Sequence, residues 1–192
     1  MKAYQALPGG YREIYSVNMQ KDKKLAFWLN FFSLVIGAVM AAPMHFYIPI
    51  STVFDMSEGT GMYFLRFGAM LVFTALYMVA HELVHGIAMK SFGTKKVKYG
   101  FTGLFAYAGS TDYYGKAAYI IIALAPVVVW GIVIGVIHAF VPESWFWVVY
   151  YLQICNISGA AGDFFVTAKF SRMPWDILVT DCGLGMTVYS RQ

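Results

Sequence analysis

The sequence predicts an all-α membrane protein with four transmembrane helices and a short β-hairpin-like loop between the second and third helices. Three observations support this fold class. Of the 192 residues, 59% are hydrophobic and only 12% are charged, whereas a soluble domain usually has about 25% charged residues. The hydrophobic residues form long runs of the length that a membrane-spanning helix needs. Aromatic residues make up 18% of the chain, as expected where helix ends meet lipid headgroups.

This composition excludes an ordinary soluble enzyme, a nucleic-acid-binding protein and a disordered protein. The length leaves room for four or five spans and little else, so we treat residues 1–192 as a single integral membrane domain. The two cysteines, Cys155 and Cys182, lack the spacing of metal ligands and are expected to be packing residues.

Four hydrophobic runs predict the spans. Their expected bounds are 25–48, 62–89, 117–140 and 145–168. The first run begins too late and extends too far for the core of a signal peptide, so we expect it to be retained. Pro43 and Pro126 should bend the first and third spans.

The loop from Val97 to Tyr107 differs from the spans. Hydrophobic residues alternate there with small or polar ones, and this period of two is typical of a strand. The alternating positions are Val97, Tyr99, Phe101, Phe105 and Tyr107. Glycines at 100, 103 and 109 allow the loop to bend into a hairpin. An amphipathic loop at the membrane interface would show the same pattern.

The distribution of basic residues predicts the orientation. Thirteen of the fourteen lysines and arginines fall in the N-terminal arm, the Lys90–Lys116 loop and the C-terminal tail, and only Arg66 lies elsewhere. The positive-inside rule therefore predicts that both termini are cytoplasmic, with the plasma membrane of a prokaryote as the expected location. These charges would contact anionic membrane lipid, so they imply no nucleic-acid partner. The oligomeric state stays open.

The second span contains His81-Glu82-Leu83-Val84-His85 near its end. Two histidines four residues apart lie on one face of a helix, where both can bind one Zn²⁺ ion. Zinc lowers the pKa of a bound water toward neutrality, and a glutamate beside the ligands can accept the proton. Ionisable residues within a span are expected to be functional. The pattern predicts zinc ligands at His81 and His85 and a general base at Glu82.

A catalytic zinc site takes a third protein ligand. The candidates are Asp112, His138, Asp163, Asp176 and Asp181. His138 is expected at the far end of its span, and Asp176 and Asp181 follow the last span. Asp163 lies within an apolar span at a depth matching the histidines, and it is the preferred ligand. Asp112, after the basic loop, stays an alternative, and Asp163 could instead be a buried carboxylate bonded within the protein.

These features resemble the site-2 protease type of intramembrane zinc metalloprotease. More narrowly, a small chain with HELVHG and a distal Gly162-Asp163 resembles the "Putative zincin peptidase" family of membrane proteins. The resemblance covers about residues 62–170, the expected catalytic core. It implies zinc ligands at His81, His85 and Asp163 and a general base at Glu82. The segment before Asp163 has glycines where the site-2 pattern has prolines.

Two further roles are expected near this core. Asn156 could stabilise a tetrahedral oxyanion with its amide, or it could bond a neighbouring helix. The site-2 resemblance implies an edge strand beside the zinc that pairs with an unwound substrate, and the Val97–Tyr107 loop is the candidate.

The main hypothesis is a zinc-dependent intramembrane endopeptidase that hydrolyses a peptide bond in or near a transmembrane segment of a membrane protein. The alternative is a non-catalytic metal-binding membrane scaffold or a protein that binds partner helices. A small transporter is a third possibility, but its ionisable residues would be expected to line a path, and the chain shows no repeated half.

Overall fold

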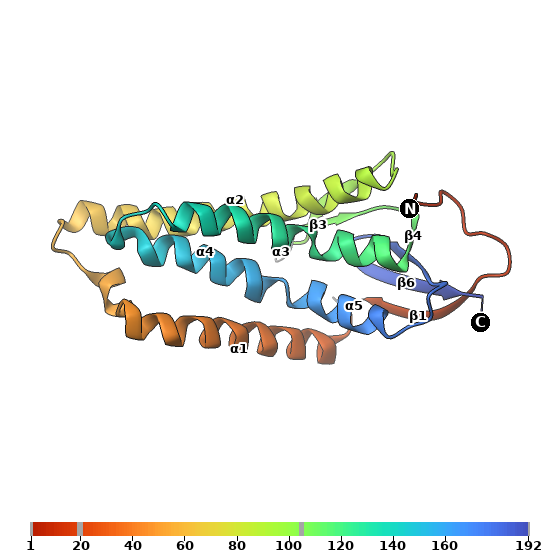
Figure 1. Ribbon diagram of the computed structural model, residues 1–192, viewed down its shortest axis with the longest axis horizontal. Helices are drawn as coiled ribbons and strands as arrows, with labels where there is room; N and C mark the ends of the chain where they lie inside the picture. The colour runs from red at the N-terminus through yellow and green to blue at the C-terminus, as the bar shows by residue number, and fades with distance from the viewer. Residues whose placement is uncertain (1, 19–20, 104–105, 192) are drawn as a thin grey trace. The chain divides into compact units, whose positions relative to one another are not determined.

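The computed structural model describes residues 2–18, 21–103 and 106–191 and shows a mostly helical chain with two antiparallel sheets (Figure 1). The α-helices are α1 (Lys23–Tyr47), α2 (Thr60–Ser91), α3 (Lys116–His138), α4 (Phe146–Gly159) and α5 (Ala161–Ser171). The short 3-10 helices are η1 (Ile50–Phe54) and η2 (Glu143–Trp145). The strands are β1 (Arg12–Asn18), β2 (Lys98–Phe101), β3 (Ala106–Gly109), β4 (Tyr113–Gly115), β5 (Leu178–Asp181) and β6 (Gly185–Ser190).

The chain forms two compact units. The first unit consists of Met1–Leu29, His81–Pro126 and Gly162–Gln192, and it contains both sheets. The second unit consists of Asn30–Ala80 and Val127–Ala161 and is helical. The single domain expected from the sequence stays a prediction.

Helices α1, α2 and α3 are long and apolar enough to cross a membrane. Their bounds agree within two residues with the first three spans expected from the sequence. The 32 residues of α2 extend about 48 Å at 1.5 Å per residue, more than the roughly 30 Å hydrocarbon core requires. None of the residues of α1 is buried within the protein. Such an apolar, exposed surface is suited to lipid, so these helices are those of a membrane protein.

The fourth span expected from the sequence is not one helix. Residues 145–168 form η2, then α4 and α5, which are separated at Ala160. Ala160 has a ψ of 17° and donates its backbone N–H to the Ser158 carbonyl. Glycines at 159 and 162 flank the break, and glycine is a weak helix former. A count of four spans therefore stays a prediction, since three helices in the described part of the chain meet the criterion.

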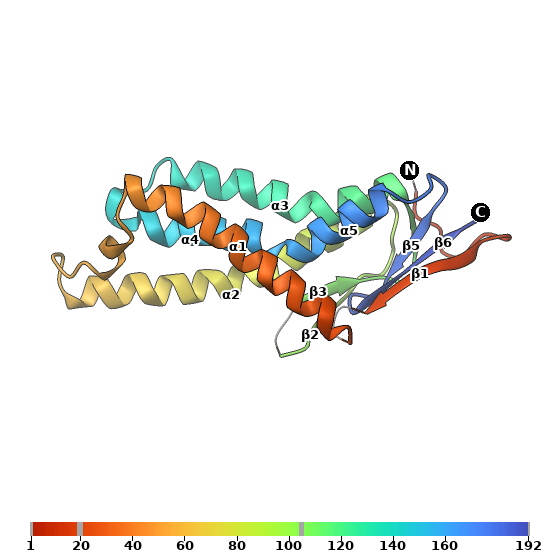
Figure 2. The ribbon, with the colours of Figure 1, turned by 90° about the horizontal axis from the view of Figure 1, so that it is seen from below.

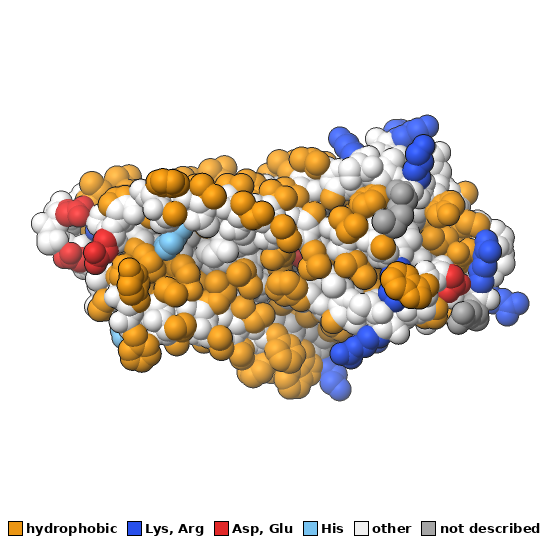
Figure 3. All heavy atoms as spheres, viewed as in Figure 1, with side chains coloured by type: hydrophobic (Ala, Val, Ile, Leu, Met, Phe, Trp, Pro, Cys, Tyr) orange, Lys and Arg blue, Asp and Glu red, His pale blue; other side chains and the backbone are white. Residues whose placement is uncertain are grey.

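In the second unit, α2, α3 and α4 run along one another, and α1 crosses them at an angle (Figures 1 and 2). Ile48, Phe146 and Trp147 form its buried cluster. The Trp147 indole Nε1–H donates to the Ile48 carbonyl at 3.2 Å, and the Tyr150 hydroxyl donates to the Met40 carbonyl at 2.9 Å. On the face shown in Figure 3, hydrophobic side chains cover most of this unit, and acidic side chains gather at the loop between α1 and α2.

The first unit contains a four-stranded antiparallel sheet in the order β1-β6-β5-β4, seen beside both chain termini in Figure 2. The pairing of β1 with β6 runs from Arg12 opposite Ser190 to Asn18 opposite Gly185. The all-α description is therefore wrong for both ends of the chain. Strands β1 and β4 lie far in sequence from their partners β6 and β5, so the local sequence pattern does not reveal these pairings.

The hairpin expected between the second and third spans is confirmed. Strand β2 pairs antiparallel with β3, from Lys98 opposite Gly109 to Phe101 opposite Ala106. Phe105, one of the alternating positions that indicated the strand, lies outside the described residues.

The core of the first unit joins the sheet to the ends of three helices. Tyr114 of β4, Met89 of α2, Tyr119 of α3 and Phe170 of α5 belong to one buried cluster. Lys116, only 7% exposed, donates through Nζ to the carbonyls of Ser171 at 2.6 Å and Met173 at 2.7 Å. A cation there satisfies carbonyls that a helix end leaves unpaired. This contact fixes the C-terminal end of α5.

Candidate metal centre

Helix α2 carries His81 and His85 one turn apart on the same face. Their imidazole rings lie 4.9 Å apart between centroids, with the ring planes at 76°. The helix ends six residues after His85 at Ser91, where Gly93 takes a φ of 100°. Both histidines therefore belong to the C-terminal part of α2, which lies in the first unit.

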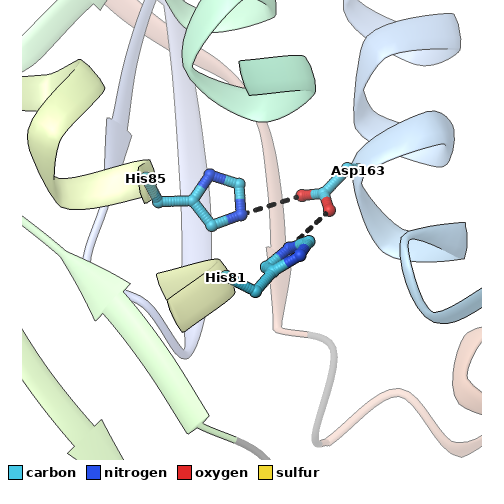
Figure 4. Close-up of side chains that lie close together, drawn as sticks. All are labelled: His81, His85 and Asp163. Carbon is cyan, nitrogen blue, oxygen red and sulfur yellow. Dashed lines mark ion pairs between the residues drawn. The ribbon is translucent and has the colours of Figure 1, made fainter. Parts of the chain in front are cut away.

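Asp163, in α5, lies next to these two histidines. The break at Ala160 starts a new helix, which puts Asp163 in its first turn. Asp163 Oδ2 lies 3.4 Å from His81 Nε2, and Asp163 Oδ1 lies 3.5 Å from His85 Nε2. Figure 4 shows the Asp163 carboxylate opposite the two imidazoles, with one oxygen directed at each ring. The structure thus brings together the three residues that the sequence singles out as ligands.

The donor set and its spacing fit a zinc ion. One ligand atom from each of the three side chains lies within 4.8 Å of the others, and no other such group occurs among the described residues. Zinc bonds of about 2.1 Å in a tetrahedron place ligand atoms about 3.4 Å apart, close to the spacing here. Distances of 3.4 and 3.5 Å are too long for strong hydrogen bonds. Side-chain exposures of 12–20% leave the group largely shielded but not sealed.

The second nitrogen of His85 has its own partner. His85 Nδ1 lies 2.9 Å from the backbone carbonyl oxygen of Ile122 in α3. A carbonyl only accepts, so this hydrogen bond needs the proton on Nδ1 and leaves Nε2 free to bind a metal. Metal-binding histidines usually have such an outer partner. Sequence reasoning did not find Ile122, because the contact comes from its backbone.

Glu82 lies beside the ligands and is contacted by the hairpin. The backbone N–H of Ala108 in β3 donates to the Glu82 carboxylate. Ala108 is buried, with 6% exposure. The hairpin therefore lies against the residue expected to act as the general base. The sequence indicated a strand in this loop but gave no signal for this backbone contact.

Gly86 explains how β2 approaches α2. A Cβ on Gly86 would overlap the hydroxyl of Tyr99, whose ring lies against the helix there. Any larger residue would push Tyr99 away. The glycine after His85 thus lets the hairpin lie close to the HELVHG segment.

The other candidate ligands have other surroundings. The backbone N–H of Asp112 donates to Ser110 Oγ at 3.2 Å. The His138 ring lies 4.6 Å from the Phe146 ring in the second unit. Asp176 accepts the backbone N–H of Arg191 at 2.8 Å, and this bond lowers the pKa of its carboxyl. None of these residues belongs to the metal-binding group in the described part of the chain.

Asp181, the remaining candidate, takes part in a separate contact. Its Oδ2 accepts the Tyr119 hydroxyl at 2.5 Å, and its Oδ1 accepts the backbone N–H of Gly183 at 2.7 Å. Burial raises the pKa of Asp181 to about 6. The residue therefore joins α3 to the turn between β5 and β6.

Asn156 is fully buried in the second unit. Its Oδ1 accepts the Tyr77 hydroxyl at 2.8 Å, and its Nδ2 donates to the Val127 carbonyl at 3.1 Å. The amide thus bonds neighbouring helices, the second of the two roles expected for it. An oxyanion role for Asn156 stays a prediction.

A comparison with models of known protein families identifies the family of this chain. Residues 74–178 match the family model described as "Putative zincin peptidase". The match covers 105 of the 192 residues, and it includes the histidines, Glu82 and Asp163. No curated protein and no solved structure matches the chain. Because the family model covers more than half of the sequence, the chain belongs to the Putative zincin peptidase family.

Proposed function

We propose that this protein is a zinc-dependent intramembrane endopeptidase of the site-2 protease type. It hydrolyses a peptide bond in or near a transmembrane segment of a membrane protein. The observation that carries the proposal is the convergence of His81, His85 and Asp163 beside Glu82. A structural zinc site usually has four protein ligands, whereas a catalytic site has three and keeps one position open. The described residues supply three.

His81 and His85 would hold the zinc through Nε2, and Asp163 through its carboxylate. Zinc bound there would lower the pKa of a water and polarise the scissile carbonyl. The Glu82 carboxylate takes a proton from the attacking water as the new carbon–oxygen bond forms. Glu82 then gives this proton to the departing amide nitrogen as the carbon–nitrogen bond breaks. The products are a carboxylic acid and an amine, so one water is consumed per peptide bond.

The substrate would bind as an extended strand along β3. Backbone groups of alternate residues in a strand point to the same edge. Ala108 directs its N–H to Glu82, so Ala106 directs its backbone groups along that same edge. Strand addition there would place a peptide bond beside the general base. A transmembrane substrate must unwind to expose its backbone, and such pairing would stabilise the unwound segment.

The membrane setting follows from α2. This helix is long and apolar enough to cross a membrane, and it carries both histidines. His81 lies ten residues before the end of α2 at Ser91, about 15 Å along the axis. We propose that a site on this helix acts on chains that are themselves in the membrane. Both termini are proposed to be cytoplasmic, with lipid as the surrounding partner.

The test compares membrane proteins from cells that make wild-type protein with those from cells that make Glu82→Gln. Glutamine keeps the shape of the side chain but accepts protons far less well, so hydrolysis should fall by at least about a hundredfold. Fragments of membrane proteins should disappear from the variant. Glu13→Gln, an exposed glutamate of β1, is the matched control and should preserve the fragments. Unchanged fragments in Glu82→Gln would contradict the proposed mechanism.

A further inference from the structure

Helix α3 contains a proline four residues after the carbonyl that contacts His85. In an α-helix, the carbonyl of one residue accepts the N–H of the residue four positions later. The acceptor Ile122 would therefore be paired with the N–H of residue 126. Residue 126 is Pro126, which has no N–H. The Ile122 carbonyl consequently has no intrahelical donor at that position.

His85 supplies the missing donor. Its Nδ1 lies 2.9 Å from the Ile122 carbonyl oxygen. Ile122 is 2% exposed and Pro126 is fully buried, so water has little access to this carbonyl. A buried carbonyl without a partner is costly. The hydrogen-bond donor that the proline lacks is thus replaced by a side chain from another helix of the same unit.

This bond determines which nitrogen of His85 faces the other ligands. With the proton held on Nδ1, the lone pair is on Nε2, which lies 3.5 Å from Asp163 Oδ1. Figure 4 shows this edge of the ring directed at the carboxylate. The ring is therefore oriented for metal binding before any ion arrives, which lowers the ordering cost of binding.

We propose that Pro126 is a positioning residue of the metal centre. It frees the Ile122 carbonyl, and the carbonyl fixes the tautomer and orientation of His85. This inference rests on the proposed zinc site. The usual role of a proline in a spanning helix is to bend it. A bend alone would not determine which nitrogen of a histidine ring carries the proton.

Pro126→Ala tests the proposal. Alanine adds an N–H that competes with His85 for the Ile122 carbonyl. Zinc affinity, measured by competition with a chelator, should fall about 10–100-fold, as for other outer partners of metal ligands. The melting temperature should be unchanged or higher, because alanine is more favourable than proline in a helix interior. Pro43→Ala, the same change inside α1, is the matched control and should bind zinc like the wild type.

A second measurement uses the wild-type chain without metal. Nitrogen-15 NMR of histidine-labelled protein at pH 8, assigned with His85→Gln, should place the His85 proton on Nδ1. A proton on Nε2 would overturn the proposal, as would unchanged zinc affinity in Pro126→Ala. A weakened affinity accompanied by a lower melting temperature would show a merely structural role and also overturn it. Absence of zinc binding by the wild type would instead contradict the proposed function, and this inference with it.

Discussion

Two residues of the candidate metal centre, His85 and Glu82, form hydrogen bonds to backbone groups that are not themselves candidate ligands. His85 is bonded to the Ile122 carbonyl, and Glu82 accepts the N–H of Ala108. Both partners are backbone groups, so the identity of the side chain at either position gives no sign of the contact. The two histidines and the glutamate were predictable as candidates because their pattern is local: two histidines at helical spacing flank a glutamate. The groups that orient them were not, because they come from β3 and α3.

Asp181 should make stability depend on pH. Its pKa is about 6 in the folded protein, against about 4 in an unfolded chain. The folded state therefore binds this proton more tightly than the unfolded state does. Protonated Asp181 stabilises the fold below pH 4, and this stabilisation is lost as pH rises through about 6. The loss amounts to about 2–3 kcal/mol.

Asp181→Asn should remove this dependence. Between pH 4 and 6, the melting temperature of the wild type should fall relative to that of the variant. The measurement is thermal unfolding in detergent at several pH values. Parallel curves for the two proteins across this range would show that Asp181 does not titrate as described.

At the scale of elements, the break between α4 and α5 determines the position of Asp163. A single helix through residues 145–168 would have left Asp163 in a helix interior. With the break at Ala160, it lies in the first turn of α5. A carboxylate in a first turn also lies near the positive end of the helix dipole. The glycines at 159 and 162 weaken a helix here, but the sequence alone does not show where the break falls.

The four-stranded sheet shows the limit of sequence reasoning. Strand β1 pairs with β6 across more than 160 residues of chain. Short polar strands become stable only through such pairing, and a scan of local pattern cannot detect the partner. The hairpin was predictable because both of its strands lie within one short loop with a period of two.

The proposed role of β3 predicts an effect at Ala106. The backbone N–H of Ala106 lies on the same edge of β3 as the Ala108 N–H that contacts Glu82. Ala106→Pro removes the N–H of Ala106 from this edge. Cleavage of a membrane substrate should fall at least about tenfold, because one strand-pairing bond is lost and the ring obstructs the edge. Zinc content should stay at the wild-type level. The assay is cleavage of a tagged transmembrane substrate in membranes.

Ala106→Ser keeps the N–H and serves as the control for changing this position. It should cleave the substrate at nearly the wild-type rate. Full activity in Ala106→Pro would mean that substrate does not pair with this edge, while leaving the metal centre unaffected.

At the scale of the molecule, all but one of the basic residues belong to one unit. The thirteen lysines and arginines other than Arg66 all belong to the segments of the first unit. Arg66 lies in the second unit, where it is buried and paired with Glu58. The face in Figure 3 shows the basic side chains gathered over the first unit. The positive-inside rule therefore predicts that this unit faces the cytoplasm, as proposed above.

Cys182 offers a native probe of that orientation. It is exposed between β5 and β6, whereas Cys155 lies on α4 and is partly buried. A membrane-impermeant maleimide should fail to label Cys182 in intact cells and should label it in inverted vesicles. Cys182→Ser is the control and should abolish labelling of the inverted vesicles. Labelling of Cys182 in intact cells would reverse the proposed orientation.

Zinc content tests the central claim most directly. Elemental analysis of the purified protein should find about one zinc per chain in the wild type and in Glu82→Gln. Asp163→Asn should hold far less, because a neutral amide replaces the carboxylate that faces both histidines. Asp112→Asn, at the alternative ligand, should keep one zinc. Full zinc in Asp163→Asn, or its loss in Asp112→Asn, would contradict the assignment of His81, His85 and Asp163 as the metal centre.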